Sequence, residues 1–376
     1  MNERHARLVL GRATEPGDHR VARLVERLGP AGVVDRLAAD VTTTGERSPV
    51  AEKVLGADPE RELAIGRRLG LRYLIPGDEE WPSSAGDLAY AEPVDRHGGA
   101  PLGLWVRGEG RLDELTRAAV AVVGSRSATA YGADLAQRIG YDLGEAGVSV
   151  LSGAAFGIDY AAHRGALGSS TPTIAVLACG ADRPYPSAHA ELLRRIAVTG
   201  VVLSEQPPGT NPSRLRFLAR NRLIAALGRG TVVVEAALRS GALSTANWTG
   251  RLNRALMGCP GPVTSVASTG VHELIRAGRA SLVVDAGQVL EIVSPAGQHA
   301  LPPQRGAERA SDGLAGEQLR LLDALPVARG STAAALAHRA NLTEVAAQVG
   351  LQQLRQRDLA TERDGLWRLG PAALRR

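Results

Sequence analysis

Three apolar segments of this sequence end in short turns of small or polar residues. The first segment, residues 119–123, is too short for a free-standing helix and rich in β-branched side chains, which is typical of a buried parallel strand. The segments at 148–151 and 232–235 have the same character. The turns that follow supply these candidate residues: Gly124, Ser125 and Arg126; Ser152 and Gly153; Ser240, Gly241 and Thr245.

These turns fit the chemistry of anion binding. The carboxyl ends of parallel strands meet at one edge of a sheet, where open α/β sheets bind their ligands. Small residues there leave backbone N–H groups accessible at the starts of the following helices, and such groups bind phosphate. Arg126 adds a permanent positive charge whose planar fork matches phosphate oxygens. For any one such turn, a tight connection without a ligand is the alternative.

A cluster of arginines lies further along the chain, in the segment RLRFLARNR at 214–222. Arg216 and Arg220 are one helical turn apart and are predicted to share a face. Phosphates require cations and unpaired bases require a stacking surface, so a basic helix with one aromatic ring suits single-stranded nucleic acid. The alternative is a solvated basic helix whose Phe217 packs in the core. The candidate residues here are Arg216, Phe217, Arg220, Asn221 and Arg222.

Three other titratable residues could take part in chemistry. Asp159 and His163 are four residues apart, so they share a helix face, either as an acid–base pair or as a structural pair. Glu235 at a strand end could be catalytic, could orient Arg220, or could cap the helix expected at 243–253. No set of residues completes a catalytic triad, and no His/Cys spacing matches a metal site. We therefore expect no catalytic residue, no metal and no cofactor.

The composition sets broad limits. The formal net charge is +5, from 44 basic and 39 acidic residues, which is a mild indication of a polyanionic partner. Lys53 is the only lysine, and the wealth of Arg, Ala, Gly and Pro indicates coding bias. Cys179 and Cys259 lie in apolar contexts and are expected to be reduced thiols of a cytoplasmic protein. The N-terminus does not resemble a signal peptide, and no apolar run approaches the ~20 residues of a membrane span.

The order of patterns along the chain predicts four regions. Residues 1–70 have the pattern of short helices, and 71–293 alternate strands with helices, which predicts a Rossmann-like, doubly wound α/β core with a mostly parallel sheet. Residues 294–313 form a polar linker rich in Pro and Gly. Residues 314–376 show three helical patterns and then a hairpin, the order of a winged-helix domain. Its third helix begins with few basic residues, which favours protein docking slightly over DNA binding.

A series of short motifs runs through the core in a fixed order. They are VAVVGSRSATAYG and VLSGAAFGIDYAAH around the first two turns, TIAVLACGADRPYP at 173–186, LSEQPPGTNP at 203–212, ARNRLIAAL at 219–227, VVVEAALRSGALSTA at 232–246 and CPGPV at 259–263. In this order they resemble the DNA-processing protein A family, also called DprA or Smf, and an ordered series is more specific than any single motif. One departure is Leu218, where the family usually has Pro.

The resemblance implies a bacterial, cytoplasmic protein of DNA processing, natural transformation and recombination. Such a protein binds single-stranded DNA through its phosphates, protects incoming strands, forms a homodimer and helps to load the RecA recombinase. It also implies an N-terminal module similar to a SAM or helix-hairpin-helix domain. Two other functions stay open: a nucleotide phosphoribohydrolase of the lysine decarboxylase-like group, whose double-glycine phosphate turn this sequence lacks, and a regulator that binds double-stranded DNA through the C-terminal domain.

Overall fold

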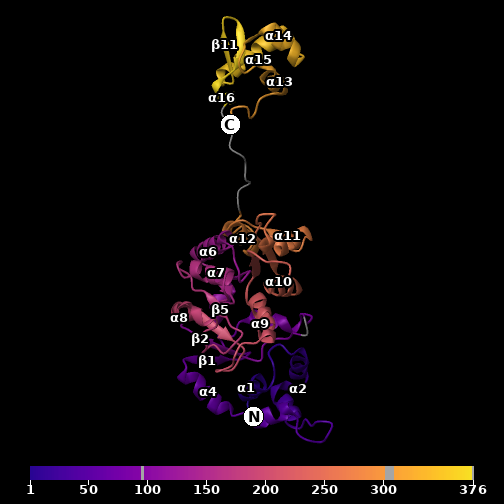
Figure 1. Ribbon diagram of the computed structural model, residues 1–376, viewed down its shortest axis with the longest axis vertical. Coiled ribbons are helices and arrows are strands. Elements are labelled where there is room, and N and C mark those ends of the chain that lie inside the picture. The colour runs from indigo at the N-terminus through magenta and orange to yellow at the C-terminus, as the bar shows by residue number, and fades with distance from the viewer. Residues whose placement is uncertain (95–96, 301–308, 375–376) are drawn as a thin grey trace. The chain divides into compact units, whose positions relative to one another are not determined.

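Figure 1 shows the computed structural model of the chain, which describes residues 1–94, 97–300 and 309–374. Contacts between residues divide the chain into two compact units, Met1–Leu301 and Pro302–Arg376. The larger unit carries the predicted core and the N-terminal helices, and the smaller unit carries the predicted C-terminal helices and hairpin. Of the predicted linker at 294–313, residues 301–308 lie outside the described part of the chain.

A nine-stranded sheet forms the centre of the larger unit, in the order β1-β2-β6-β5-β4-β3-β7-β8-β9. Along this order, all neighbouring strands between β6 and β9 pair in parallel, whereas β1 and β2 form an antiparallel edge next to β6. The predicted α/β fold with a mostly parallel sheet is therefore confirmed. The strands are β1 (Leu71–Leu74), β2 (Leu104–Arg107), β3 (Ala119–Val123), β4 (Ser149–Ser152), β5 (Ile174–Val176), β6 (Val201–Ser204), β7 (Gly230–Val233), β8 (Ala255–Gly258) and β9 (Ser281–Leu282).

Helices cover both faces of this sheet. Side chains alternate along β3, so Val120 and Val122 join a core with α6, α7 and α12, whereas Ala121 and Val123 join a core with α9, α10 and α11. The helices are α5 (Leu112–Arg117), α6 (Ala130–Glu145), α7 (Ile158–Ala166), α8 (Ala190–Thr199), α9 (Arg214–Leu227), α10 (Ala242–Arg251), α11 (Thr269–Arg276) and α12 (Ala286–Val293), with short 3-10 segments η1 (Ser83–Ala89), η2 (Ser187–His189) and η3 (Val266–Ser268).

The connections change direction at β3. From β3 the chain passes through α6 to β4 and onwards to β5 and β6, and α9 then returns it to β7 on the other side of β3. At such a switch point the two neighbouring connections leave on opposite faces of the sheet, and a crevice opens beyond the carboxyl ends of the strands. The topology thus places a crevice between the turns that follow β3 and β7.

Four helices precede the sheet: α1 (Glu3–Ala13), α2 (His19–Ala38), α3 (Pro49–Leu55) and α4 (Pro59–Arg68). Each begins after a short polar side chain that accepts a free N–H of the first turn, as Asp58 does for α4. They pack on the edge of the sheet, where Leu8 joins a core with Tyr73 and Trp105. Gly66 lies so close to Trp105 that a Cβ there would be 2.3 Å from the indole ring. The four helices and the sheet therefore form one compact unit.

The smaller unit consists of α13 (Gly316–Ala324), α14 (Ala333–Ala340), α15 (Glu344–Gln356) and α16 (Pro371–Leu374), with an antiparallel sheet of β10 (Ser331–Thr332), β12 (Leu366–Leu369) and β11 (Ala360–Arg363). At the turn between β11 and β12, Asp364 and Gly365 have φ values of 54° and 74°. A two-residue type I′ turn needs two such positive values. The three helices and the hairpin predicted for this region are all present.

A buried histidine of α7 is held in its neutral form. The Thr173 hydroxyl donates its proton to the Val150 carbonyl at 2.7 Å, so it must accept from Nδ1 of His163 at 2.9 Å. The imidazole proton is thus on Nδ1, and Nε2 has no partner in the described part of the chain. Burial, together with the charge of nearby His189, lowers the pKa of His163 to about 3.

We expect acid to destabilise the larger unit through His163. Because the folded pKa is about 3 and the unfolded pKa about 6.5, the unfolded chain binds one additional proton between these values. The free energy of unfolding is therefore unaffected by the protonation of His163 above about pH 6.5. Below that pH it decreases by up to about 1.4 kcal/mol per pH unit. His163→Asn keeps a donor for Thr173, and its melting temperature should depend less steeply on pH in this range. An unchanged slope would contradict the assignment.

Candidate nucleic-acid interface

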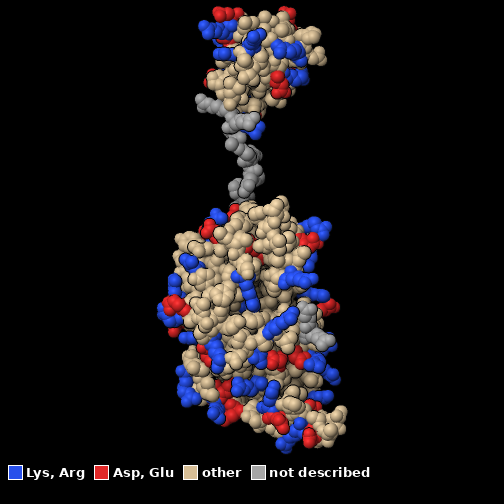
Figure 2. All heavy atoms as spheres, viewed as in Figure 1, with Lys and Arg blue, Asp and Glu red and all other residues tan. Residues whose placement is uncertain are grey.

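An open cleft lies at the predicted position, where the turns after β3 and β7 face the start of α9. Its wall includes nine of the thirteen residues that the sequence singled out and several that it did not. Figure 2 shows Lys and Arg side chains over the part of the larger unit where α9 and α10 lie in Figure 1. The predicted residues on the wall are Gly124, Ser125, Arg126, Phe217, Arg220, Asn221, Ser240 and Gly241, together with Thr245 at the base of α10.

The turn after β3 is tightly packed. A Cβ on Gly124 would lie 2.5 Å from Ile158 and 2.8 Å from the Glu235 carbonyl, so only glycine fits there. The Ser125 N–H donates to the same Glu235 carbonyl at 2.7 Å. This corrects one expectation: the N–H of Ser125 is satisfied within the protein. What the turn offers to a ligand is the side chain of Arg126, which is exposed.

The guanidinium of Arg126 lies over the ring of Phe217, 4.7 Å from its centroid. No carboxylate pairs with Arg126 among the described residues. Asp159, the carboxylate on the same wall, instead accepts from the N–H groups of Gly153 at 3.2 Å and Ala155 at 3.4 Å. Burial raises the pKa of Asp159, although the charge of Arg220 opposes this. The positive charge of Arg126 is therefore uncompensated at the cleft.

Two further arginines of the wall are exposed and have no ion pair in the described part of the chain: Arg214 at the start of α9, and Arg239 in the turn after β7. Neither was a predicted site residue. Asp159 is the one carboxylate on the wall within the described residues. The electrostatic potential in the cleft is therefore positive, and the low-dielectric walls of a cleft strengthen such a potential.

Arg220 lies under the cleft rather than on an exposed face. It is 6% exposed and donates from Nη1 to the Val176 carbonyl at 2.7 Å, while its Nε has no partner among the described residues. Burial lowers its pKa to about 10, so it stays charged at neutral pH. A Cβ on Gly153 would be 1.8 Å from Nη1 of Arg220. Gly153 therefore does not line the cleft itself but leaves the space that Arg220 fills.

Phe217 is half-buried and belongs to an aromatic cluster on the wall. The Tyr185 ring lies 5.7 Å from it at an angle of 52°, and the guanidinium of Arg220 is 5.9 Å from its centroid. Tyr185 is 42% exposed and was not predicted, because the only signal for it is one aromatic residue in a Pro-rich loop. Phe217 is therefore not a core residue, which was the alternative for it.

The start of α10 closes the other side of the cleft. Asn221 donates from its side chain to the Gly241 carbonyl at 3.3 Å, which ties α9 to this end of α10. The Ser240 hydroxyl accepts the Ala242 N–H at 3.3 Å. The amino end of α10 directs the positive end of its dipole towards the cleft.

Two predicted residues, Ser152 and Arg216, have other roles in the structure. Ser152 is buried and donates to the Val122 carbonyl at 2.7 Å, so it joins β4 to β3. Arg216 makes two hydrogen bonds of 2.9 Å to the carboxylate of Glu15. Neither residue lies on the cleft wall, and Arg216 does not share an exposed face with Arg220.

Arg222 is the clearest correction. Its side chain is 0% exposed and forms an ion pair with Glu205, with an Nη2–Oε1 distance of 2.6 Å and a second contact through Nη1. Its Nε donates to the Gly99 carbonyl at 3.2 Å. All three guanidinium nitrogens are thus used inside the protein, and Arg222 is not available to a ligand.

Glu235 has none of the three roles considered for it. It is 1% exposed, and its carboxylate accepts from the hydroxyl of Thr129 at 2.5 Å and from the N–H of Thr129 at 2.9 Å. Thr129 is the residue that caps α6. Glu235 therefore secures the amino end of α6, and it does not face the cleft, cap the helix expected at 243–253 or contact Arg220 through a hydrogen bond.

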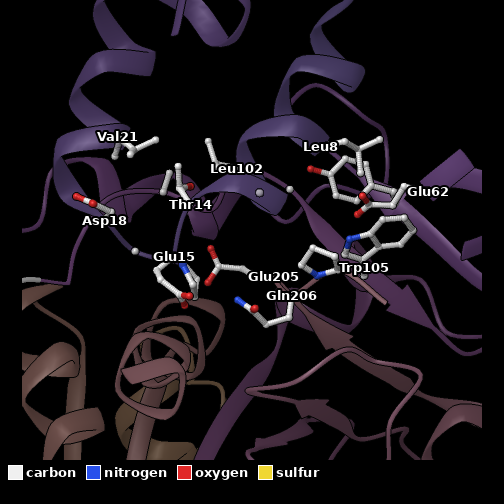
Figure 3. A pocket seen from close by; sticks show the side chains of 18 of the residues that line it. Leu8, Thr14, Glu15, Asp18, Val21, Glu62, Leu102, Trp105, Glu205 and Gln206 are labelled. Atoms are coloured by element: carbon white, nitrogen blue, oxygen red, sulfur yellow. The ribbon is translucent and has the colours of Figure 1, made fainter. Parts of the chain in front are cut away.

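A second pocket lies between the N-terminal helices and the edge of the sheet, and Figure 3 shows the side chains around it. Four carboxylates surround this pocket, those of Glu15, Asp18, Glu62 and Glu205, together with apolar groups such as Trp105. No Lys or Arg lines this pocket within the described residues, so it is not a second part of the basic cleft. Within the described residues, we find no cluster of three metal-ligating side chains and no helix with the length and apolar character of a membrane span.

The fold and the cleft define a class of protein: a Rossmann-like α/β protein with a basic, aromatic-lined cleft at the switch point of its sheet. The family model for DNA recombination-mediator protein A matches residues 72–294. The chain belongs to this family, whose members are named DprA or Smf.

Relatives support this assignment over nearly the whole chain. A Mycobacterium tuberculosis protein, provisionally named DNA processing protein DprA, is 43% identical over 368 residues, which cover 96% of this chain and 92% of the relative. The DNA processing protein DprA of Streptococcus pneumoniae is 41% identical over 191 residues, which cover 51% of this chain and 66% of the relative. The names describe DNA processing and give no catalytic activity.

Two solved structures are similar. The X-ray structure of DprA from Streptococcus pneumoniae has a TM-score of 0.64 and 29% identity, and the match covers 78% of this chain and 99% of that chain. A structure of DNA processing protein A from Helicobacter pylori, described in terms of its single-stranded DNA binding mode, has a TM-score of 0.51 and 28% identity, with 58% of this chain and 94% of that chain covered.

We expect Arg222→Leu to destabilise the larger unit by roughly 3–5 kcal/mol, because it leaves the carboxylate of Glu205 as an unpaired charge in a buried place. The matched control is Arg216→Leu, which leaves Glu15 in solvent and should cost no more than about 1 kcal/mol. Urea unfolding followed by tryptophan fluorescence measures both. A stable Arg222→Leu protein with weakened DNA binding would instead restore the role that the sequence predicted.

Proposed function

We propose that this chain binds single-stranded DNA in the cleft at the switch point and acts in DNA processing by binding rather than by catalysis. One observation carries the proposal: Arg126 lies over the ring of Phe217 at the cleft, with no carboxylate to neutralise it among the described residues. A cation and an aromatic face at one place suit a phosphate and the base attached to it.

The aromatic ring favours a single strand over a duplex. Stacking on Phe217 requires a base whose face is free, and the bases of a duplex are already stacked on one another. Arg214 and Arg239 add positive charge on the same wall and can follow a flexible backbone. The match to the Helicobacter pylori protein, described as having a single-stranded DNA binding mode, supports the same choice.

The cellular role that we propose follows the family. The chain protects incoming single strands during natural transformation, helps to load the RecA recombinase onto them, and acts as a homodimer in the cytoplasm. The support for these steps is membership of the DNA recombination-mediator protein A family.

We propose four regions within this architecture. Residues 1–70 form a SAM-like helical module, 71–293 the Rossmann-like DNA-binding core, 294–313 a linker, and 314–376 a winged-helix domain. The order of three helices and a hairpin supports the last assignment. We propose protein docking for this domain, because α15 begins with Glu344 and an exposed Val345 where a helix that reads DNA would carry cations.

Arg126→Ala tests the central proposal. The variant should remain folded, since Arg126 is exposed, and should lose affinity for a single-stranded oligonucleotide. Its log–log dependence of affinity on salt should become flatter by about 0.7, the value for one phosphate contact on a single strand. Titrations at several salt concentrations, with single- and double-stranded oligonucleotides, measure this.

The control for that experiment is Arg276→Ala, which removes an exposed arginine paired with Glu273 on α11 and outside the cleft. It should leave both affinity and slope as in the wild type. Equal slopes for wild type and Arg126→Ala would remove Arg126 from the site, and tighter binding of the duplex would reverse the proposed preference.

Phe217→Leu should weaken binding of a single strand by about 1–3 kcal/mol, because a leucine cannot stack with a base. The salt dependence should not change, because no charge is removed. The melting temperature, measured on the same preparation, separates this effect from a loss of folding. A lower melting temperature with unchanged affinity of the folded protein would identify Phe217 as a structural residue.

A further inference from the structure

A second basic hollow lies away from the cleft, between the N-terminal helices. It has a volume of about 510 Å³, and three cationic side chains from three different helices line it: Arg12 from α1, Lys53 from α3 and Arg61 from α4. All three are exposed, and none forms an ion pair in the described part of the chain. Cations gathered from separate helices without partners repel one another, so the hollow suits an anion.

Two carboxylates also line this hollow. Asp58 is occupied as the cap of α4, where it accepts the Arg61 N–H at 2.9 Å. Glu62 is half-buried, and one of its oxygens is buried without a partner among the described residues. Burial raises the pKa of Glu62, although the charge of Arg12 opposes this. The three positive charges therefore outnumber the negative charges of the two carboxylates, even when Glu62 is ionised.

One loop connects this hollow with the cleft. The segment between β6 and α9 places Pro208 on the wall of the hollow and Pro212 and Ser213 on the wall of the cleft. Four residues span at most about 14 Å. The two basic sites are thus close enough for one flexible polyanion to reach both.

The loop between the sites is held in a fixed shape. The Asn211 side chain accepts from Arg183 at 2.8 Å, and its carbonyl accepts from Arg216 at 2.7 Å. The Gly209 N–H donates to both carboxylate oxygens of Asp182, at 3.0 and 3.1 Å. Arg183 is exposed and adds a cation beside this path.

We propose that the hollow between α1, α3 and α4 is a second phosphate subsite, which holds the backbone of the same DNA strand that occupies the cleft. This inference rests on the proposed function and extends it, because it assigns a nucleic-acid contact to the N-terminal helices. A strand long enough to leave the cleft along the loop at 208–212 places its phosphates among Arg12, Lys53 and Arg61. A short strand occupies the cleft alone.

Lys53 offers a direct test, because it is the only lysine of the sequence. An amine-reactive reagent labels just two amines, the Lys53 side chain and the exposed amino terminus of Met1. A single-stranded oligonucleotide of about 20 nucleotides should slow the labelling of Lys53 several-fold and leave Met1 unchanged, because a strand of this length exceeds the ~4–16 nucleotides that one binding groove covers. An oligonucleotide of about 5 nucleotides, and inorganic phosphate at the same phosphate concentration, should leave the rate at Lys53 unchanged.

A charge-matched pair of variants provides the second measurement. Arg61→Gln should flatten the salt dependence of binding by about 0.7 for the long oligonucleotide and leave that for the short one unchanged. Arg67→Gln removes the same charge from α4 outside the hollow and should behave as the wild type with both. Both arginines are exposed, so both variants should keep the melting temperature of the wild type.

The outcomes distinguish failure of the second subsite from failure of the proposed function. Binding of the long strand that depends on Arg126 but leaves Lys53 unprotected overturns the subsite and leaves the cleft in place. Equal effects of Arg61→Gln and Arg67→Gln also overturn it. Protection of Lys53 by inorganic phosphate alone identifies a site for the free ion instead of DNA. Failure of both oligonucleotides to bind overturns the proposed function together with the subsite.

Discussion

The site depends on one contact across the switch point of the sheet, made by Glu235. Its carbonyl accepts the Ser125 N–H, which fixes the turn after β3 against the strand end of β7. Its carboxylate accepts two hydrogen bonds from Thr129, which fixes the start of α6. Gly124 and Gly132 allow this close approach, since a Cβ on Gly132 would lie 2.3 Å from the Glu235 carboxylate carbon. Without this contact, nothing in the turn itself would aim Arg126 at the cleft.

Helix α9 shows how one arginine-rich segment serves several physical purposes. Arg214 is exposed on the cleft, Arg216 pairs with Glu15 at the surface, Arg220 lies beneath the cleft, and Arg222 pairs with Glu205 in the interior. A buried pair gives little net stability, because desolvation offsets the attraction, but removing one partner is costly. Arg222 therefore fixes α9 against the β6 end of the sheet, and in this position Arg214 is exposed on the cleft and Arg220 lies beneath it.

The fold and the location of the cleft could be predicted from the sequence, because local patterns encode them. Short apolar runs followed by small residues identified β3, β4 and β7, and the rule for switch points placed a ligand at their carboxyl ends. The separate roles of the arginines in α9 could not be predicted in this way. Arg216 meets a carboxylate 201 residues away, and Arg222 meets one on a different element 17 residues away. Charge alone does not tell a cation that binds DNA from one that binds a distant glutamate. The same limit explains why Arg239 was missed, since only the folded chain brings that turn beside α9.

The arrangement of charge at the cleft is a physical reason for a polyanion to bind there. Arg126 and Arg220 both lie against the ring of Phe217, and the charge of Arg126 helps to lower the pKa of Arg220. The two cations thus repel each other across one aromatic side chain, and Asp159 only partly balances them from its buried position. A phosphate bound near both guanidinium groups would replace this repulsion with two attractions, in a place where Arg220 is already desolvated. The free-energy cost of removing water from Arg220 is incurred when the chain folds, so it does not weaken the binding of a ligand.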